Sequence, residues 1–426
     1  KPIGYLPTDD PSMADLVLLN TCSVRDKAEH KMMSALGRYA RLKEYNDELL
    51  LGVGGCVASQ EGERLLRKAP YLDLVFGPDN IAQLPDLVFA ARQKNERVAI
   101  TEFLKRDEYE WIPLEHQSSG QVSAMLTVMK GCNKFCSFCI VPFTRGREVS
   151  KPSSLVVQET KTLVESGVKE VMLLGQNVNS YGRDRRGEPK FPELLAMVND
   201  VPGLERIRFT TSHPWDCTDD LIRAFDGRLG KLCEYFHLPV QSGSDTMLKK
   251  MRRGYTLESY LHQVEKLRGA CPEISMSTDI IVGFPGETES QFEETINLLE
   301  TVRFDRIFSF AYSERPNTAA SRLTDDIAPV VKAERLQRVQ ALQAKITAEA
   351  MAPYKGKVVQ VLVEGPSKHA FSPDGSWNGL QLTGRTRTNF VVNFAAGGSS
   401  GLVGQLLDVK ITKAMQNSFY GELMET

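Results

Sequence analysis

Apolar residues in the first part of the chain recur in short runs that are separated by longer amphipathic stretches. The runs lie at 16–19, 49–53 and 72–76, and a helical pattern occupies 26–45. Short apolar runs that alternate with helical patterns are typical of parallel strands, because such strands are buried on both faces. The pattern therefore predicts a small α/β domain at the N-terminus.

A second series of apolar runs predicts six further strands. They lie at 125–129, 171–174, 207–211, 236–240, 278–282 and 307–312, with helical patterns between some of them at 153–166, 256–270 and 288–302. Strands and helices in alternation form right-handed βαβ units, so we expect a full or partial (β/α) barrel. Its chemistry should lie at the carboxyl ends of the strands.

The pattern changes again near residue 352. Apolar positions at helical spacing predict one long amphipathic helix at 330–352. Short alternating runs then follow, broken by clusters of Gly, Pro and Ser, and they predict a small antiparallel β-barrel. We therefore expect an α/β protein with three domains, at 1–117, 118–352 and 353–426.

Composition limits the classes of protein to which the chain can belong. Hydrophobic residues make up 42% and charged residues 25%, and no apolar run approaches the roughly 18 residues of a membrane span. The start of the chain lacks the regions of a signal peptide, so we expect a cytoplasmic protein without a membrane segment. The net charge of −2 means that any nucleic acid must be bound by local basic patches.

The cysteines indicate metal chemistry rather than disulfides. Eight cysteines scattered over 426 residues do not form a disulfide framework. Three of them, Cys132, Cys136 and Cys139, are separated by three and two residues directly after the first predicted barrel strand. Three thiolates on one tight loop can bind three corners of a 4Fe-4S cluster and leave one iron open to a small molecule.

Two other interpretations of this loop are weaker. A structural zinc ion needs four ligands, and neither Cys nor His occurs in the 70 residues that follow Cys139. Buried cysteines without a ligand role are common singly, but three at this spacing after a strand are not expected. The sequence therefore favours an iron–sulfur cluster.

The three-cysteine loop after a barrel strand resembles that of the radical S-adenosylmethionine superfamily. The resemblance implies that the open iron binds S-adenosylmethionine, whose reductive cleavage yields a 5′-deoxyadenosyl radical. It also implies that this cofactor is bound by Phe138, Gln176, Ser212, Gln241 and Asp279. Without the resemblance, amide side chains at strand ends can equally satisfy loop backbone. Arg145 is the candidate catalytic residue, because a guanidinium pairs with carboxylate, phosphate or sulfur species.

Two further cysteine motifs resemble those of the methylthiotransferase N-terminal domain. They are Asn20-Thr-Cys22-Ser-Val-Arg25 and Gly54-Gly-Cys56-Val-Ala58. The resemblance implies that Cys22 and Cys56 bind an auxiliary 4Fe-4S cluster together with a third cysteine upstream, although the sequence has no cysteine before Cys22. Considered alone, each is as readily a buried structural cysteine that follows a strand.

The string Leu174-Gly-Gln-Asn-Val-Asn-Ser-Tyr181 is similar to that of the MiaB type, the tRNA 2-methylthio-N6-isopentenyladenosine synthases. The resemblance implies methylthiolation of C2 of isopentenyladenosine in a tRNA anticodon stem-loop, with a reductase or flavodoxin-type electron donor and a monomeric enzyme. Lys151 and Asn317 depart from the type, which has Arg and Gly there. The alternatives are a methylthiotransferase for another tRNA adenosine or a ribosomal protein, and a non-catalytic iron–sulfur RNA-binding regulator.

The C-terminal stretch 383–394, TGRTRTNFVVNF, resembles a TRAM domain, a module associated with RNA binding. Arg385, Arg387 and Phe390 would then provide charge beside an aromatic ring, which suits phosphates and an unstacked base. The alternative is a solvated hairpin with a core phenylalanine, because small barrels also bury aromatic rings.

Overall fold

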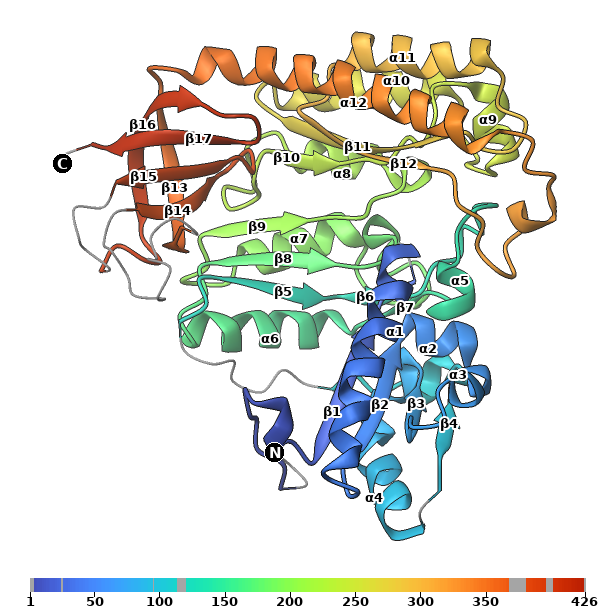
Figure 1. Ribbon diagram of the computed structural model, residues 1–426. Helices are drawn as coiled ribbons and strands as arrows, with labels where there is room; N and C mark the ends of the chain where they lie inside the picture. Colours follow the sequence, from blue (N-terminus) through green and yellow to red (C-terminus); the bar gives the residue numbers. More distant parts are fainter. Residues whose placement is uncertain are drawn as a thin grey trace. The chain divides into compact units, whose positions relative to one another are not determined.

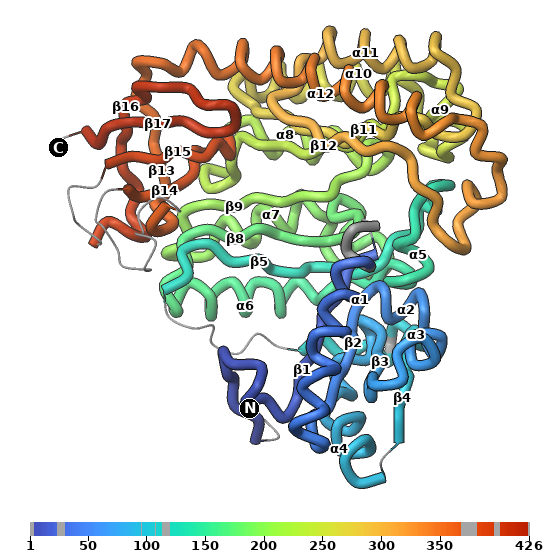
Figure 2. The backbone as a smooth tube through the Cα atoms, in the orientation of Figure 1, coloured from blue at the N-terminus to red at the C-terminus, as the bar shows by residue number. Residues whose placement is uncertain are grey.

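The computed structural model describes residues 4–23, 26–94, 96–112, 120–367, 381–395 and 401–424. The chain forms two compact units (Figures 1 and 2). The first unit contains 1–112, 130–149 and 313–322, and the second contains 113–129, 150–312 and 323–426. The boundary expected at residue 118 lies outside the described residues, and the division into three domains stays a prediction.

The first unit contains a four-stranded parallel sheet, which agrees with the predicted α/β fold. Its strands follow chain order: β1 (Leu16–Thr21), β2 (Leu50–Gly55), β3 (Leu74–Phe76) and β4 (Val98–Ile100). The helices are α1 (Asp26–Ala40), α2 (Cys56–Glu61), α3 (Glu63–Lys68), α4 (Leu84–Lys94) and the short α5 (Val141–Thr144). Every residue of β2 is buried, as expected for a central parallel strand.

The second unit contains the six predicted barrel strands in two three-stranded parallel sheets. The strands are β5 (Ser123–Thr127), β8 (Glu170–Leu174) and β9 (Arg206–Phe209), then β10 (Tyr235–His237), β11 (Ser275–Val282) and β12 (Arg306–Ala311). An isolated parallel bridge between Ile207 and Leu232 links the end of one sheet to the start of the next. Short strands β6 (Met129–Lys130) and β7 (Val149–Ser150) mark where the chain passes between the units.

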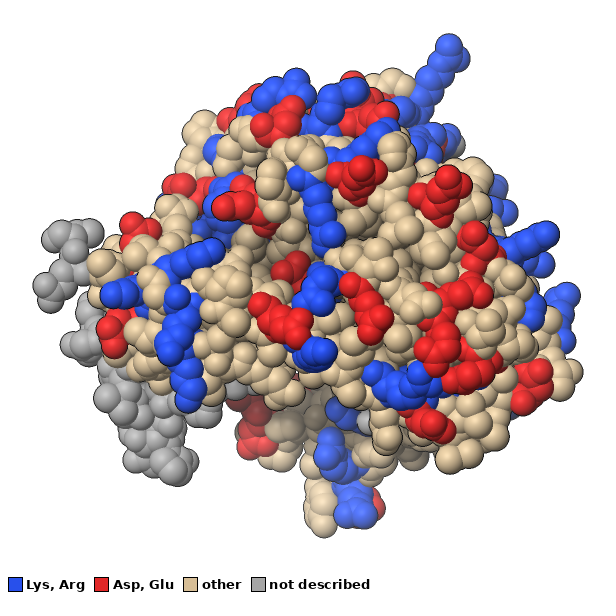
Figure 3. All heavy atoms as spheres, turned by 90° about the horizontal axis from the view of Figure 1, so that it is seen from above, with Lys and Arg blue, Asp and Glu red and all other residues tan. Residues whose placement is uncertain are grey.

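Helices cover one face of these strands. They are α6 (Ser153–Glu165), α7 (Phe191–Asn199), α8 (Asp219–Arg223), α9 (Asp245–Lys250), α10 (Leu257–Ala270), α11 (Glu289–Val302) and α12 (Pro329–Met351). Alternate strand residues such as Leu126, Val171 and Ile207 join the core beneath the helices. The outer face of α11 and α12 carries interspersed charges (Figure 3), for example Arg338 paired with Glu289 at 2.7 Å.

The C-terminal part of the second unit is a closed five-stranded barrel, as predicted. Its strands are β13 (Val358–Pro366), β14 (Gln381–Thr386), β15 (Val391–Ala395), β16 (Leu406–Ala414) and β17 (Ser418–Leu423), in the order β13-β14-β15-β17-β16. Four of the pairings are antiparallel, and β15 pairs with β17 in parallel. At Gly384 a Cβ atom would lie 2.2 Å from the carbonyl oxygen of Leu362, so the close approach of β14 to β13 requires glycine.

Among the described residues, none of the helices combines the length and apolar character that crossing a bilayer needs.

Candidate functional site

The loop that carries three of the cysteines belongs to the first unit. Cys132 and Cys136 are buried and Cys139 is half-buried. Burial, with smaller contributions from nearby Cys139 and Cys136, raises the pKa of the Cys132 thiol to about 12. The three thiols therefore lie close enough to interact electrostatically. A bound metal would convert them to thiolates.

The donor set of this loop fits a cluster. Within the described residues, no three His, Cys, Asp or Glu side chains lie close enough to share one metal ion. A cubane does not need this closeness, because each thiolate ligand binds a different iron. The spacing of the three thiols on one loop is therefore compatible with three corners of a 4Fe-4S cluster, which stays a prediction.

The backbone of the cysteine loop is tightly fixed. Gly131 has a φ of 75°, and a Cβ atom there would lie 2.0 Å from the carbonyl oxygen of Arg147. The loop is also closed by Asn133, whose backbone N–H and side-chain amide donate to the two carboxylate oxygens of Glu148 at 3.2 and 3.3 Å. Only glycine suits a left-handed position with such close backbone contact.

A buried ion pair anchors the start of this loop to the 3-10 helix Pro78–Gln83, which follows β3. The ammonium group of Lys130 pairs with the carboxylate of Asp79, and both side chains are at most 8% exposed. The same ammonium lies 3.9 Å from the centre of the Tyr109 ring. Burial lowers the pKa of Lys130, and Asp79 opposes this effect. Sequence reasoning missed this group, because the three residues share no motif.

Cys22 and Cys56 follow two neighbouring strands of the first unit. Strands β1 and β2 are parallel, and Thr21 pairs with Gly55, so the next residue on each strand is a cysteine. A Cβ atom at Gly55 would lie 2.5 Å from the carbonyl oxygen of Thr21. Neighbouring strands lie about 4.8 Å apart. The two thiols therefore stand at adjacent strand ends and fit two ligands of one cluster.

Arg145 lies against one of these thiols. Its Nε–H donates to the Sγ atom of Cys56 at 3.0 Å, although the two residues are 89 positions apart. Arg147, two residues later, instead stacks over the ring of Phe135 at 4.4 Å. The structure therefore brings the predicted catalytic arginine to a predicted auxiliary-cluster ligand. Its catalytic role stays a prediction.

Four of the residues predicted to bind S-adenosylmethionine belong to the second unit, whereas the half-buried Phe138 belongs to the first. The N–H of Gln241 donates to the carbonyl oxygen of Asp279 at 2.9 Å, so these two lie together. Gln176 is half-buried just after β8. Ser212 follows β9, and among the described residues its buried hydroxyl has no hydrogen-bond partner. An unsatisfied buried hydroxyl costs free energy unless a ligand binds it, so this position fits a polar cofactor.

Known proteins resemble the chain over its whole length. Three family profiles match: the uncharacterized protein family UPF0004 at 1–77, the radical SAM superfamily at 126–299 and the TRAM domain at 353–424. The tRNA-2-methylthio-N(6)-dimethylallyladenosine synthase of Geobacter metallireducens is 52% identical over 99% of this chain and 92% of its own length. The corresponding synthase of Syntrophotalea carbinolica is 50% identical over 99% of this chain and 93% of its own length. The chain belongs to the tRNA-2-methylthio-N(6)-dimethylallyladenosine synthase family.

Among solved structures, the radical S-adenosylmethionine methyltransferase TsrM from Kitasatospora setae, with tryptophan and a cofactor analogue bound, has the same kind of fold. The TM-score is 0.56 at 14% identity, covering 79% of this chain and 78% of that chain. The radical SAM fold of the synthase family is therefore present here.

Both departures from the synthase type have a physical explanation. Asn317 has a φ of 65°, the left-handed conformation that glycine usually provides and that asparagine also tolerates. Lys151 is buried, and its ammonium lies 2.5 Å from the carboxylate of Glu159. The lysine therefore balances the charge of a buried carboxylate.

The three residues predicted to contact RNA all make contacts within the chain. Phe390 is 1% exposed and packs in the core of the small barrel, so its ring is not available to an RNA base in this structure. This agrees with the alternative of a core phenylalanine. Arg385 pairs with Glu364 at 3.1 Å. As RNA contacts, these two residues and Arg387 stay predictions.

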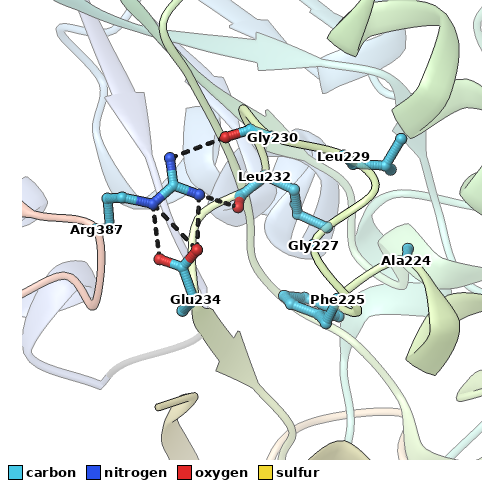
Figure 4. Close-up of a pocket in the computed structure, with 8 residues that line it drawn as sticks. All are labelled: Ala224, Phe225, Gly227, Leu229, Gly230, Leu232, Glu234 and Arg387. Carbon is cyan, nitrogen blue, oxygen red and sulfur yellow. Dashed lines mark hydrogen bonds and ion pairs between the residues drawn. The ribbon is translucent and has the colours of Figure 1, made fainter. Parts of the chain in front are cut away.

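Arg387 fastens the small barrel to the rest of the second unit (Figure 4). Its guanidinium donates to the carboxylate of Glu234 at 2.7–3.0 Å and to the carbonyl oxygens of Gly230 and Leu232 at 3.0 and 2.6 Å. These groups line a pocket of about 210 Å³. The side chain is thus engaged within the chain rather than held out toward solvent.

Two buried arginines of β9 donate hydrogen bonds to backbone carbonyl oxygens of the same hairpin. Arg206 donates to the carbonyl oxygen of Arg385 at 2.6 Å. Arg208 donates to the carbonyl oxygens of Arg387 and Thr386 at 2.7 and 2.6 Å, and its charge is paired with Glu170 at 3.0 Å. We call Arg206, Arg208, Arg387 and Glu234 the arginine joint. Sequence reasoning missed it, because each bond spans more than 150 residues.

Proposed function

We propose that this protein adds a methylthio group to C2 of N6-dimethylallyladenosine beside the anticodon of a tRNA. One observation carries the proposal: the three-cysteine loop and two further thiols at adjacent strand ends occur in a chain 52% identical to a synthase of this name over 99% of its length. The proposal includes a cytoplasmic, monomeric enzyme that accepts electrons from a reductase or flavodoxin-type donor.

The cofactors would divide among the residues as follows. Cys132, Cys136 and Cys139 would hold the cluster that binds S-adenosylmethionine, and Cys22 and Cys56 would supply two ligands of the auxiliary cluster. When bound, these groups supply a 5′-deoxyadenosyl radical and the methylthio group. The protein's part is to bind them, to orient them and to exclude water.

The residues of the second unit would bind S-adenosylmethionine through polar groups at strand ends. The unsatisfied hydroxyl of Ser212 supports this assignment, because a ligand atom would complete its hydrogen bonding. Gln241 and Asp279 are joined by a backbone hydrogen bond, which holds two of the proposed contacts in one place. Gln176 and Phe138 complete the proposed set.

The substrate adenosine must leave its stack before C2 can react. Unstacking a base costs a few kcal/mol, which protein contacts elsewhere on the RNA must offset. The TRAM match at 353–424 supports the small barrel as the source of such contacts. Because the arginine joint engages Arg387 and the core engages Phe390, other side chains of the barrel would carry most of the RNA binding.

The test is anaerobic reconstitution followed by incubation with S-adenosylmethionine, dithionite and tRNA bearing dimethylallyladenosine. Nucleosides are analysed by mass spectrometry, with Cys136→Ala as the inactive variant and Cys271→Ala as its matched control. A methylthio adduct that Cys136→Ala abolishes and Cys271→Ala retains supports the proposal. Formation of 5′-deoxyadenosine without the adduct indicates another tRNA adenosine or a ribosomal protein as substrate. Absence of both products favours the regulator.

A further inference from the structure

One hydrogen bond in the first unit joins the two predicted cluster-binding regions. Arg145 follows α5, the short helix just after Cys139, and its Nε–H reaches the buried Sγ atom of Cys56 at 3.0 Å. Helix α5 packs against α2, which begins at Cys56. The guanidinium is thus directed at one thiol by the packing of two helices.

Two other arginines of the first unit, Arg147 and Arg315, make different contacts from Arg145. The guanidinium of Arg147 stacks on Phe135 at 4.4 Å. Burial lowers the pKa of Arg315, and the charge of Cys22 opposes this effect, so that arginine lies near the second thiol. Arg145 donates a hydrogen bond to a predicted auxiliary ligand, whereas the Arg147 guanidinium stacks on an aromatic ring. This makes Arg145 and Arg147 a natural pair of test and control.

We propose that Arg145 is a positioning residue for the auxiliary cluster: its Nε–H donates to the Cys56 thiolate and makes that cluster easier to reduce. The inference rests on the proposed function, which assigns Cys22 and Cys56 to this cluster. It goes beyond that function by giving Arg145 a role at the sulfur donor rather than at S-adenosylmethionine.

The direction of the effect follows from electrostatics. Reduction adds one electron to the cluster, and the added negative charge is spread over its sulfur atoms. A hydrogen-bond donor that carries a permanent positive charge stabilises this reduced state more than the oxidised one, and guanidinium remains charged at all accessible pH values. Hydrogen bonds to cluster sulfurs are an established determinant of reduction potential. No proton or bond needs to move.

The experiment isolates the auxiliary cluster in the full chain. The parent protein carries Cys132→Ala, Cys136→Ala and Cys139→Ala, so that only the second cluster can assemble. Iron and sulfide contents are measured, and the reduction midpoint is determined by dithionite titration followed by electron paramagnetic resonance. The same titration is made with Arg145→Met, Arg145→Lys and the control Arg147→Met, each checked for folding by circular dichroism.

We expect Arg145→Met to lower the ratio of reduced to oxidised cluster at a fixed potential about tenfold, which is about 59 mV for one electron. Arg145→Lys should retain part of the effect, since its charge remains, and Arg147→Met should match the parent. Equal midpoints for Arg145→Met and the parent would overturn the role of Arg145. A parent without any cluster would overturn the proposal that Cys22 and Cys56 hold a cluster in this sequence without the third, upstream cysteine, which is a failure of the proposed function rather than of the hydrogen bond.

Discussion

Removing Arg387 distinguishes an arginine that fastens two parts of the chain from one that binds RNA. Its guanidinium donates to Glu234 and to the carbonyl oxygens of Gly230 and Leu232. Arg387→Ala deletes all of these bonds and leaves the carboxylate of Glu234 beside buried backbone. We therefore expect the hairpin that carries residue 387 to loosen from the rest of the second unit.

The magnitude follows from the exposure of the pair. Breaking a fully buried ion pair costs about 3–5 kcal/mol and breaking an exposed one about 0–1 kcal/mol. Both side chains are 28% exposed, which places the pair between these limits. Hydrogen bonds of a charged donor to carbonyl oxygens add to the loss. We expect local opening of the hairpin to become easier by about 2–3 kcal/mol, a factor of roughly 30 to 150.

Native-state hydrogen exchange of the amides at 381–395 is the appropriate assay, because a chain with several domains does not unfold in one step. The matched control is Arg385→Ala, which removes a pair with Glu364 inside the small barrel and leaves the side chain of Arg387 untouched. It should accelerate exchange less than about fivefold, as expected for a partly exposed pair. If Arg387→Ala left the hydrogen-exchange rates unchanged and weakened tRNA binding, the structural role of Arg387 would be refuted and its assignment as an RNA contact would be supported.

Three further changes test the predicted cofactor sites and their supports. Gly131→Ala should abolish iron binding by the cysteine loop, because the alanine Cβ would lie 2.0 Å from the carbonyl oxygen of Arg147. The iron content of the reconstituted protein is the measurement, and a normal iron content would contradict the tight fit. Ser212→Ala should raise the melting temperature of the cofactor-free protein slightly, because it removes an unsatisfied buried hydroxyl. It should weaken S-adenosylmethionine binding about 2- to 12-fold, for a hydrogen bond of about 0.5–1.5 kcal/mol, as measured by equilibrium dialysis. Asp79→Asn should lower the free energy of unfolding of the first unit in urea by about 3–5 kcal/mol, because Lys130 stays buried without its ion-pair partner. The double variant with Lys130→Met should recover most of this loss.

The hydrophobic pattern predicted the fold well where strands are long and buried. Strands such as β8 and β11 read as apolar runs, because parallel strands covered by helices need apolar side chains. The pattern missed β4, which has only three residues, all half-buried. It also missed β14, in which half-buried polar residues alternate with buried positions that include a glycine and a threonine. Short or polar strands are stabilised by their neighbours in the sheet, and that information is not local in the sequence.

The candidate site could be predicted where its ligands lie close together in the sequence at a characteristic spacing. The loop with Cys132, Cys136 and Cys139 is local, so its pattern indicates a cluster directly. Contacts between distant segments leave no such pattern: Arg145 and Cys56 are 89 residues apart, and Lys130 and Asp79 are 51 apart. These pairs exist only because the sheet of the first unit and the loop after β6 pack together.

The arginine-rich hairpin shows why composition alone cannot assign a nucleic-acid surface. Arginine suits phosphate and carbonyl oxygen for the same reason, a planar fork of charged donors. In this chain the guanidinium groups of Arg206 and Arg208 donate hydrogen bonds to the hairpin. Burial lowers the pKa of Arg206, because its charged form has lost contact with water. The backbone carbonyl oxygens replace the hydrogen bonds that water would otherwise make. Deleting the small barrel would remove the carbonyl partners of both guanidiniums and leave Arg208 with Glu170 alone. Loss of activity on such a deletion would therefore measure damage to the central strands as well as loss of any RNA binding, whereas substitutions at exposed barrel positions that do not contact Arg206 or Arg208 would leave the arginine joint intact.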